Sequence, residues 1–326
     1  MQRAQYASRG PVPQAVIAAV DFTLSALRAG QALIQVLAAP INPSDVLTLT
    51  GAYGMLPALP AVGGNEGVGR IVALAADVAA SKLGQLVLLP VGSGTWSSHL
   101  IADASQLIRL PEGADVEQLA MLTVNPPTAA LLLSEFVDLK PGDWVIQNAA
   151  NSAVAGYLRQ LAHSRGLHTV NIVRRQSAVA AIAGGEVVLV DGDGLAKRVA
   201  AATGGARIRL GIDAVGGQAT DRLATALGEG ATLVNYGAMS GEPCVISPAS
   251  FVFRDITLRG FWLAQWFRRA AVERQQQIFG ELAGLVASGQ LSARIQSRFP
   301  IEQIKQAVAA AAAGERDGKI LIVPKA

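Results

Sequence analysis

The stretch WVIQNAANSAVAGYLRQLAHSRGLHTVNIVRR, residues 144–175, decides the fold of this chain. A short apolar run, 144–147, is followed by a loop of small residues, 148–152. A helix is predicted next, because apolar residues recur on one helix face at Val154, Leu158, Leu161 and Ala162. A second apolar run, 168–173, then completes a strand–loop–helix–strand unit. Such a unit predicts two parallel strands joined by a right-handed crossover.

The loop is the place where a dinucleotide would bind, because N–H groups at a helix N-terminus and the helix dipole attract phosphate. The usual fingerprint is Gly-x-Gly-x-x-Gly, whereas this chain has Asn-Ser-Ala-Val-Ala-Gly at residues 151–156. The pattern alone leaves two interpretations open. Either the loop binds a dinucleotide, or its small residues only allow the helix and the strand to pack closely. Arg174 and Arg175 follow the second strand, where an NAD site would have an acidic residue. This favours NADPH, whose 2′-phosphate an arginine accommodates.

Length and composition set the outer bounds. The chain has 326 residues, of which 51% are hydrophobic and 16% charged, so we expect two domains with large cores. A net charge of +3 gives no reason to expect nucleic acid binding. Cys244 is the only cysteine, which excludes an internal disulfide and a cysteine-rich zinc site. Neither a signal peptide nor a membrane span is visible, so we expect a cytoplasmic protein.

The pattern of predicted elements changes twice along the chain. Residues 1–122 are rich in short strands, with strand-like runs at 15–20, 32–38, 69–75 and 85–90. Between 123 and 264, a helix at 128–137 precedes strands that alternate with helices, which predicts an α/β fold with a doubly wound parallel sheet. Those strands are expected at 144–147, 169–173, 187–190, 210–214, 232–236 and 256–261. Helices at 265–288 and 301–313 and a strand at 319–323 are expected to return to the first domain.

Several blocks resemble one known family. The segment INPSDVLTLTGAYGMLPALPAVGGNEGVGR, residues 41–70, is similar to the signature of the 2-enoyl thioester reductases. These are zinc-free medium-chain dehydrogenases/reductases of the mitochondrial enoyl-[acyl-carrier-protein] reductase type. The likeness recurs in the same order at 123–129, 145–152 and 260–266. It implies a Rossmann cofactor domain at 123–264 and a discontinuous, β-rich, GroES-like catalytic domain at 1–122 and 265–326.

The resemblance also implies roles for individual residues. The family's proton-donating tyrosine lies in a Gly-x-Tyr-Gly block and corresponds to Tyr53. Its substrate cleft implies roles for Asn42 and Trp266. Its NADPH contacts correspond to Asn125, Asn151, Ser152, Ala153, Val154, Arg174, Arg175, Tyr236, Gly237, Ala238, Met239, Phe261, Trp262, Leu263, Ala264 and Lys319. The chain departs from the family at Ala153 and Ala155, which reduce the room at the phosphate loop, and at Arg175, which replaces an Arg-x-Arg spacing.

The residues give an independent indication of the chemistry. Zinc alcohol dehydrogenases of this superfamily have a Gly-His-Glu motif, where this chain has Gly64-Asn65-Glu66, and no cysteine precedes it. No metal is therefore expected. Reduction of a conjugated enoyl group spreads charge into an enolate, so a hydrogen-bonded pocket and one proton donor can suffice. We therefore expect hydride transfer to the β-carbon and proton transfer to the α-carbon of an unsaturated acyl thioester.

Each residue also has a structural interpretation. Tyr53 fits an ordinary glycine-flanked turn, and Asn65 and Glu66 fit a structural turn better than chemistry. Trp262 and Trp266, spaced one helical turn apart, are by default core residues. Asn42, with Ser44 and Asp45, also fits the cap of the helix that follows it.

Three functions compete on this sequence. The first is an NADPH-dependent 2-enoyl thioester reductase acting on acyl-CoA or on an acyl carrier protein. The second is a zinc-independent quinone or enone oxidoreductase, and the third is a non-catalytic nucleotide-binding protein, which the two alanines at 153 and 155 keep open. The family further implies a homodimer paired through the cofactor domain.

Overall fold

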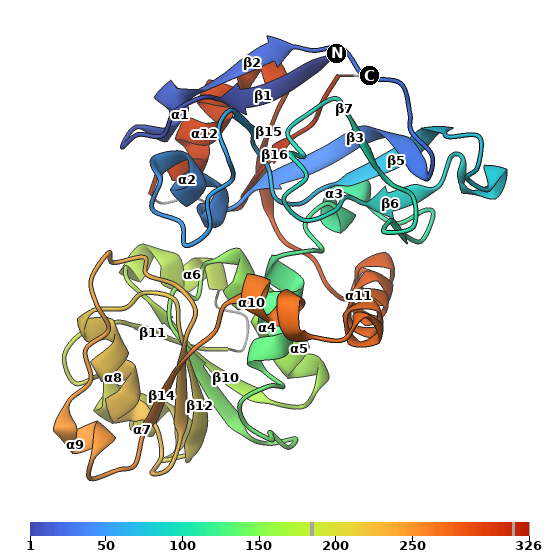
Figure 1. Cartoon of the computed structure of the whole chain (residues 1–326). Helices are drawn as coiled ribbons and strands as arrows, with labels where there is room; N and C mark the ends of the chain where they lie inside the picture. Colours follow the sequence, from blue (N-terminus) through green and yellow to red (C-terminus); the bar gives the residue numbers. More distant parts are fainter. Residues whose placement is uncertain (183–185, 315–316, 326) are drawn as a thin grey trace. The chain divides into compact units, whose positions relative to one another are not determined.

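The computed structural model describes residues 1–182, 186–314 and 317–325, and it divides the chain into two compact units (Figure 1). The first unit is Met1–Val124 with Gln276–Ala326, and the second unit is Asn125–Gln275. The sequence placed the boundaries at 122/123 and 264/265. In the structure the chain returns to the first unit later than expected, between Gln275 and Gln276 inside helix α11 (Val272–Ala287).

The second unit contains a parallel sheet of six strands in the order β11-β10-β9-β12-β13-β14. Its strands are β9 (Trp144–Gln147), β10 (His168–Val173), β11 (Val187–Val190), β12 (Ile208–Asp213), β13 (Thr232–Asn235) and β14 (Thr257–Gly260). The chain adds β10 and β11 on one side of β9 and then adds β12, β13 and β14 on the other. The expected doubly wound Rossmann sheet is confirmed, and the point where the strand order reverses lies between β9 and β12.

Helices flank this sheet (Figure 1). They are α4 (Asn125–Leu132), α5 (Ala153–Ser164), α6 (Val179–Ile182), α7 (Leu195–Thr203), α8 (Gln218–Ala226), α9 (Pro248–Phe251) and α10 (Leu263–Arg269). Helices α7 and α8 pack against each other and bury Leu195, Val199 and Leu223 on the sheet residues Ile146 and Ile172. Helices α4 and α5 pack together as a second pair.

The strand–loop–helix unit forms because its local signals agree. Ser152 caps α5, and its hydroxyl oxygen accepts a hydrogen bond from the backbone N–H of Ala155 at 3.3 Å. After the helix, Gly166 adopts a left-handed φ of 68°, which ends the helix and returns the chain to β10. The chain after β9 also turns through Ala149, a non-glycine residue with φ of 46°.

The first unit is β-rich, and the GroES-like expectation is confirmed. A seven-stranded sheet has the order β15-β16-β3-β5-β6-β8 with β7 also paired to β3, and a three-stranded sheet has the order β2-β1-β4. The strands are β1 (Gln2–Tyr6), β2 (Ile17–Asp21), β3 (Gln31–Ile41), β4 (Ala61–Val62), β5 (Val68–Leu74), β6 (Leu86–Leu88), β7 (His99–Asp103), β8 (Ile108–Arg109), β15 (Ile295–Phe299) and β16 (Lys319–Ile322). Its helices are α1 (Pro13–Val16), α2 (Pro43–Thr50), α3 (Val116–Leu119), most of α11, and α12 (Ile304–Ala312). Because β16 pairs with β3, the C-terminal segment belongs to this unit.

Three expected elements differ from the structure. The run at 15–20 begins as helix α1, and its strand β2 starts only at Ile17. The single helix expected at 265–288 is two helices, α10 and α11, and the amide of Gln275 donates to the carbonyls of Phe267 and Ala270 where they meet. The helix expected at 128–137 begins earlier, at Asn125, and ends at Leu132.

Candidate functional site

The carboxyl ends of all six parallel strands meet at one edge of the second unit's sheet, where doubly wound proteins bind ligands. The loop after β9, residues 148–152, leads into α5. Arg174 and Arg175 follow β10, residues 236–239 follow β13, and residues 261–264 follow β14. The structure thus brings together at one sheet edge the predicted cofactor residues of the second unit, except Asn125, which is buried as the first residue of α4.

The N-terminus of α5 has the chemistry that a diphosphate needs. The hydroxyl of Ser152 accepts a hydrogen bond from the backbone N–H of Ala155. No described residue accepts a hydrogen bond from the backbone N–H of Ala153 or Val154. Asn151 is exposed beside them. Free N–H groups on a twelve-residue helix are donors suited to an anion.

The alanine at 155 does not obstruct this end of the helix. Its side chain is buried inside the unit, and its carbonyl accepts a hydrogen bond from the amide of Gln147 at 3.2 Å. Ala153 is half-buried. A hydrogen bond from helix α5 also holds the loop in place, because the guanidinium of Arg159 donates to the carbonyl of Ala150 at 2.7 Å. The donors of the loop therefore fit a dinucleotide phosphate although two family glycines are missing.

The two arginines after β10 have different surroundings. Arg174 is exposed, and its guanidinium has no hydrogen-bond or ion-pair partner in the described part of the chain. Arg175 is half-buried and has other contacts. An exposed, unpaired guanidinium next to a helix N-terminus suits a phosphate monoester.

The remaining predicted residues of this edge are partly covered. Tyr236 is half-buried, and burial raises the pKa of its phenol, while a hydrogen bond with Ser152 acts weakly in the opposite direction. Trp262 precedes α10, and the guanidinium of Arg268 lies 5.0 Å from its ring centroid. Trp266 packs edge-on against Phe267, with ring centroids 5.5 Å apart. These rings contact polar or aromatic neighbours instead of filling the apolar core.

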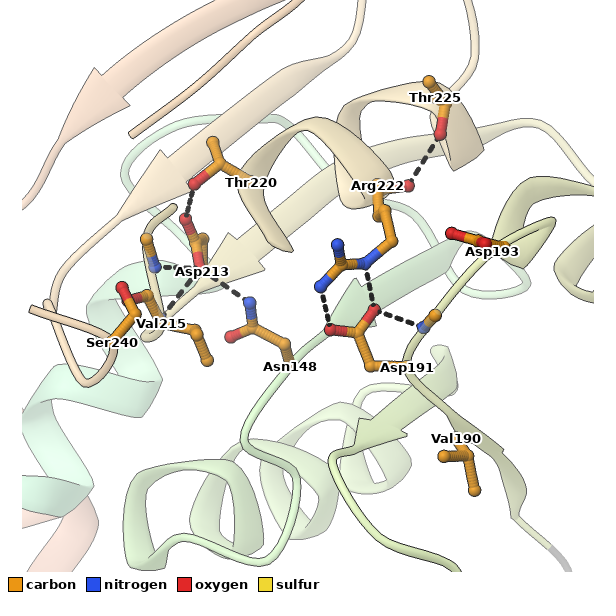
Figure 2. Close-up of polar contacts among 12 residues, drawn as sticks. Asn148, Val190, Asp191, Asp193, Asp213, Val215, Thr220, Arg222, Thr225 and Ser240 are labelled. Atoms are coloured by element: carbon orange, nitrogen blue, oxygen red, sulfur yellow. Dashed lines mark hydrogen bonds and ion pairs between the residues drawn. The ribbon is translucent and has the colours of Figure 1, made fainter. Parts of the chain in front are cut away.

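A polar cluster that the sequence did not reveal lies at the same edge (Figure 2). Asp213, the last residue of β12, is fully buried, and Asn148 at the end of β9 donates to it at 2.6 Å. A second pair lies nearby, where the guanidinium of Arg222 donates through Nε and Nη2 to both carboxylate oxygens of Asp191 at 2.6 and 2.5 Å. The signal was present in the sequence, because Asn148, Asp213 and Asn235 each end an apolar strand. A polar residue at the end of a strand usually indicates a solvent-exposed turn. Only the order of the strands in the sheet places these three residues close together.

Tyr53, Asn42 and Lys319 are predicted site residues that belong to the first unit. Tyr53 is half-buried, and its backbone N–H donates to the carbonyl of Leu47 as the chain leaves α2. Asn42 and Lys319 are both buried, and the ammonium of Lys319 donates to the amide oxygen of Asn42. The amide nitrogen of Asn42 donates in turn to Glu66 at 2.7 Å. The structure thus places the predicted substrate residue and the predicted cofactor lysine in one internal network.

Asp45 and Asn65 complete that network. Asp45 accepts from the backbone N–H of Asn42 at 2.7 Å and from the amide of Asn65 at 2.7 Å, so Asp45 caps α2 while the side chain of Asn42 is used elsewhere. Burial raises the pKa of Asp45 to about 7 and also raises the pKa of Glu66. Asn65 occupies the position of the superfamily's histidine and hydrogen-bonds a carboxylate. Within residues 1–182, 186–314 and 317–325, no three His, Cys, Asp or Glu side chains gather as a metal site would need.

Comparisons with known proteins agree with this architecture. Residues 28–112 match the model of the alcohol dehydrogenase GroES-like domain, and residues 184–322 match that of a zinc-binding dehydrogenase. The mitochondrial enoyl-[acyl-carrier-protein] reductase of Homo sapiens is 36% identical over 312 residues, covering 91% of this chain and 82% of that protein. The corresponding enzyme of Arabidopsis thaliana is 35% identical over 288 residues, covering 86% and 76%.

Solved structures show the same fold over the whole chain. A candidate NADPH:quinone reductase from Bacillus thuringiensis superposes with a TM-score of 0.89 at 25% identity, covering 99% of both chains. The complex of Etr1p with NADP and crotonyl-CoA superposes with a TM-score of 0.88 at 24% identity, also covering 99% of both. Etr1p is a mitochondrial 2-enoyl thioester reductase of Candida tropicalis.

One expectation is wrong against these findings. The sequence predicts a cytoplasmic protein, whereas the related enzymes of Homo sapiens, Rattus norvegicus and Arabidopsis thaliana are mitochondrial. The expectation rested on the lack of a visible signal peptide or membrane span, and these features do not distinguish the cytoplasm from other reducing compartments. None of the described helices is long and apolar enough to cross a membrane.

Proposed function

Because this chain belongs to the family of mitochondrial-type enoyl-[acyl-carrier-protein] reductases, which are NADPH-dependent oxidoreductases, we propose that it reduces the α,β double bond of a trans-2-enoyl thioester. The observation that carries the cofactor part is the free N-terminus of α5 with the exposed Arg174 at one sheet edge. NADPH, when bound, supplies the hydride that adds to the β-carbon. The thioester carbonyl then holds the negative charge that develops as the bond is reduced.

The second unit's residues would bind and orient the nucleotide. The N–H groups of Ala153 and Val154 would donate to the diphosphate, and Arg174 would pair with the 2′-phosphate. Residues 236–239 and 261–264, at the ends of β13 and β14, would line the remaining length of the cofactor. The half-buried rings of Trp262 and Trp266 supply apolar surface that excludes water.

Tyr53 would deliver the proton. Its hydroxyl is the donor that the family resemblance assigns. Donation to the α-carbon, directly or through a water molecule, balances the hydride that adds to the β-carbon. Asn42 and Lys319, which hydrogen-bond each other, would hold the interior of the first unit in place through the network that includes Glu66.

The second candidate is reduction of a quinone or another enone that is not a thioester. The likeness to a candidate NADPH:quinone reductase favours it, because that protein shares the whole fold at 25% identity. NADPH oxidation followed with crotonyl-CoA and, separately, with a soluble quinone distinguishes the two. We expect saturable turnover with crotonyl-CoA, and turnover with the quinone alone would overturn the proposal in favour of the alternative. Acyl carrier protein as the carrier is tested in the same assay with crotonyl attached to the carrier.

We also propose that the protein is a homodimer paired through the second unit. Strand β14 is hydrogen-bonded to β13 alone among the described strands, so one of its edges is open. In the segment that precedes β14 in the chain, Phe251, Val252 and Phe253 are 54%, 64% and 80% exposed. Light scattering should give twice the chain mass, and Phe253→Asp should shift the protein towards monomer. A monomer at micromolar concentration in the unmutated protein would exclude this arrangement.

A further inference from the structure

Asp213 is a buried carboxylate to which the proposed reaction assigns no role. It is 0% exposed and accepts five hydrogen bonds. Its Oδ1 accepts from Asn148 Nδ2 at 2.6 Å, Val215 N at 2.8 Å and Gly216 N at 3.1 Å, and its Oδ2 accepts from Thr220 Oγ1 at 2.6 Å and Asn235 Nδ2 at 3.1 Å. Figure 2 shows Asn148 and Thr220 pointing at this carboxylate from different elements. A carboxylate is retained in the interior only when its lone pairs are satisfied in this way.

Asn148 connects the ends of β9 and β12. Its amide oxygen accepts the backbone N–H of Ala214 at 2.8 Å, while its amide nitrogen donates to Asp213. Its backbone N–H donates to the carbonyl of Ile212 at 3.1 Å. The side chain is thus fixed at both polar atoms, and it holds the loop after β9 against the loop after β12.

The loop after β13 is held in the same way. The amide of Asn235 donates to Asp213 and also to the carbonyl of Gly237 at 2.9 Å. The backbone N–H of Tyr236 donates to the carbonyl of Asp213 at 2.9 Å, and that of Met239 to the carbonyl of Ala214 at 3.1 Å. Gly237 lies so close that a Cβ there would be 2.9 Å from the carbonyl oxygen of Ala214.

Asp213 and its partners Asn148 and Asn235 form a node that connects the loops after β9, β12 and β13. The position of this node in the sheet matters for binding of the cofactor. Strands β9 and β12 flank the point where the strand order reverses, and the loops that diverge there form the binding crevice of doubly wound sheets. Asn148 directly follows β9, and Asp213 is the last residue of β12. The loops that the node holds continue into residues 151–154 and 236–239, which are predicted to contact NADPH.

We propose that Asp213 and Asn148 are positioning residues for NADPH, which set the separation of the loops after β9, β12 and β13 from inside the sheet edge. This inference rests on the proposed function, because it requires NADPH to bind at this edge. Neither side chain contacts the cofactor. Each acts through backbone groups of residues that do.

The decisive variant is Asp213→Asn. It keeps the side-chain volume but replaces one carboxylate oxygen by an amide NH₂ group. That group faces hydrogen-bond donors with which it cannot pair, so the loops should move apart. It also removes a negative charge from a site for an anionic cofactor, and electrostatics alone would therefore strengthen NADPH binding. We expect the dissociation constant for NADPH, measured by titration calorimetry, to rise about 10-fold or more, since small misplacements of binding groups are costly. An unchanged or lower dissociation constant in the folded variant overturns the inference.

Asn148→Ala supplies a second variant in case Asp213→Asn does not fold. It changes no charge and removes only the connection between the loops after β9 and β12. It should weaken NADPH binding in the same direction, and parent affinity in this variant also overturns the inference.

Two controls separate positioning from general stability. Thr220→Val removes the hydrogen bond from Asp213 to α8, which carries no predicted cofactor residue. Asp143→Ala removes contacts to Arg209 at 3.1 Å and to Lys140 N at 2.8 Å at the opposite end of β9. Both should lower the unfolding temperature of the free protein and leave the NADPH dissociation constant within about twofold of the parent. If the controls weaken NADPH binding as much as Asp213→Asn does, the node has only a structural role.

The parent protein distinguishes this inference from its premise. If the unmutated protein does not bind NADPH, the proposed function fails and the inference fails with it. If the parent binds NADPH and the two node variants bind it equally well, the inference alone is wrong.

Discussion

The carboxylate of Glu66 holds the backbone of Val124, with Oε2 2.8 Å from the Val124 nitrogen and 2.9 Å from that of Thr123. Val124 is the last residue of the first unit before the chain enters the second, and Asn125, a predicted NADPH contact, follows it. The other oxygen of Glu66 accepts from Asn42, which accepts from Lys319. A buried ammonium is thereby linked, through one amide and one carboxylate, to the segment that leaves the unit.

Glu66→Gln should destabilise the first unit. One side of the glutamine amide must donate where Glu66 now accepts from two N–H groups and from Asn42, and Lys319 loses its nearby negative charge. Removing one member of a buried charged pair costs about 3–5 kcal/mol. Urea unfolding followed by tryptophan fluorescence should show this loss. Glu112→Gln is the matched control, because Glu112 is about half exposed and lies 3.7 Å from Arg70, and it should change stability little. Equal stability of the two variants would contradict the role of Glu66.

Asp45 should make stability fall as pH rises between about 4 and 7. Burial raises its pKa from 3.8 to about 7 in the folded protein. In this window the folded state holds a proton that the unfolded state has released, so the free energy of unfolding decreases with pH, by at most about 1.4 kcal/mol per unit. Above pH 7 the contribution of Asp45 no longer changes.

Asp45→Asn tests that slope against the parent, because the half-buried Asn65 can rotate its amide to face the new side chain. Urea unfolding at several pH values should give the variant a flatter dependence, while the slope from Glu66, whose pKa is also raised, stays in both proteins. Parallel curves for the two proteins would show that Asp45 does not titrate in this range.

Arg174→Ala should remove most of the preference for NADPH over NADH. A charge-assisted hydrogen bond contributes about 1.5–3 kcal/mol, which is roughly 10- to 150-fold in affinity. Dissociation constants for both cofactors in parent and variant measure it. Lys197→Ala, which removes another exposed cation of the second unit, should leave the ratio unchanged. Equal affinity of the parent for NADPH and NADH would show that the preference does not exist.

Tyr53→Phe should lower turnover while leaving NADPH affinity almost unchanged, since the predicted nucleotide contacts other than Lys319 lie in the second unit. General acid catalysis typically contributes about 10²–10⁴-fold, and the substitution deletes only the hydroxyl. The assay is NADPH oxidation with crotonyl-CoA, with Tyr6→Phe as a control that removes a hydroxyl from the same unit. Parent turnover in Tyr53→Phe would exclude this residue as the donor, and a loss of stability with normal turnover would indicate a turn residue.

Activity should survive dialysis against a chelator. Asn65 replaces the superfamily's histidine and hydrogen-bonds Asp45, and Cys244, the only cysteine, is exposed. Such residues cannot supply a tetrahedral site of nitrogen and sulfur ligands. Stoichiometric zinc in the purified, active protein would contradict both this prediction and the proposed proton donor.

The sequence predicted best the elements whose signals are local. Strands β9 and β11 are bounded as expected, because each is a short apolar run of strand length that ends at a turn. Strand β15 was missed, since its sequence, IQSRF, is mostly polar and pairs only with β16 at a sheet edge. The sequence pattern predicts a structural turn at Glu66 and gives no indication of a buried carboxylate at Asp213. Their burial depends on partners far away in the chain, such as Val124 and Asn148, and no local pattern reports such partners.

The node around Asp213 also has a consequence for the order of folding. Asn148 and Asp213 are 65 residues apart in the chain, so their contact closes a long loop and forms late. The carboxylate cannot be enclosed until β9, β12 and β13 have paired, so we expect its hydrogen bonds to form after the rate-limiting step. Its hydrogen bonds then act on the escape from the native state, and they slow unfolding more than they speed folding. The loops that line the predicted crevice are therefore fixed in place only after the sheet that carries them is complete.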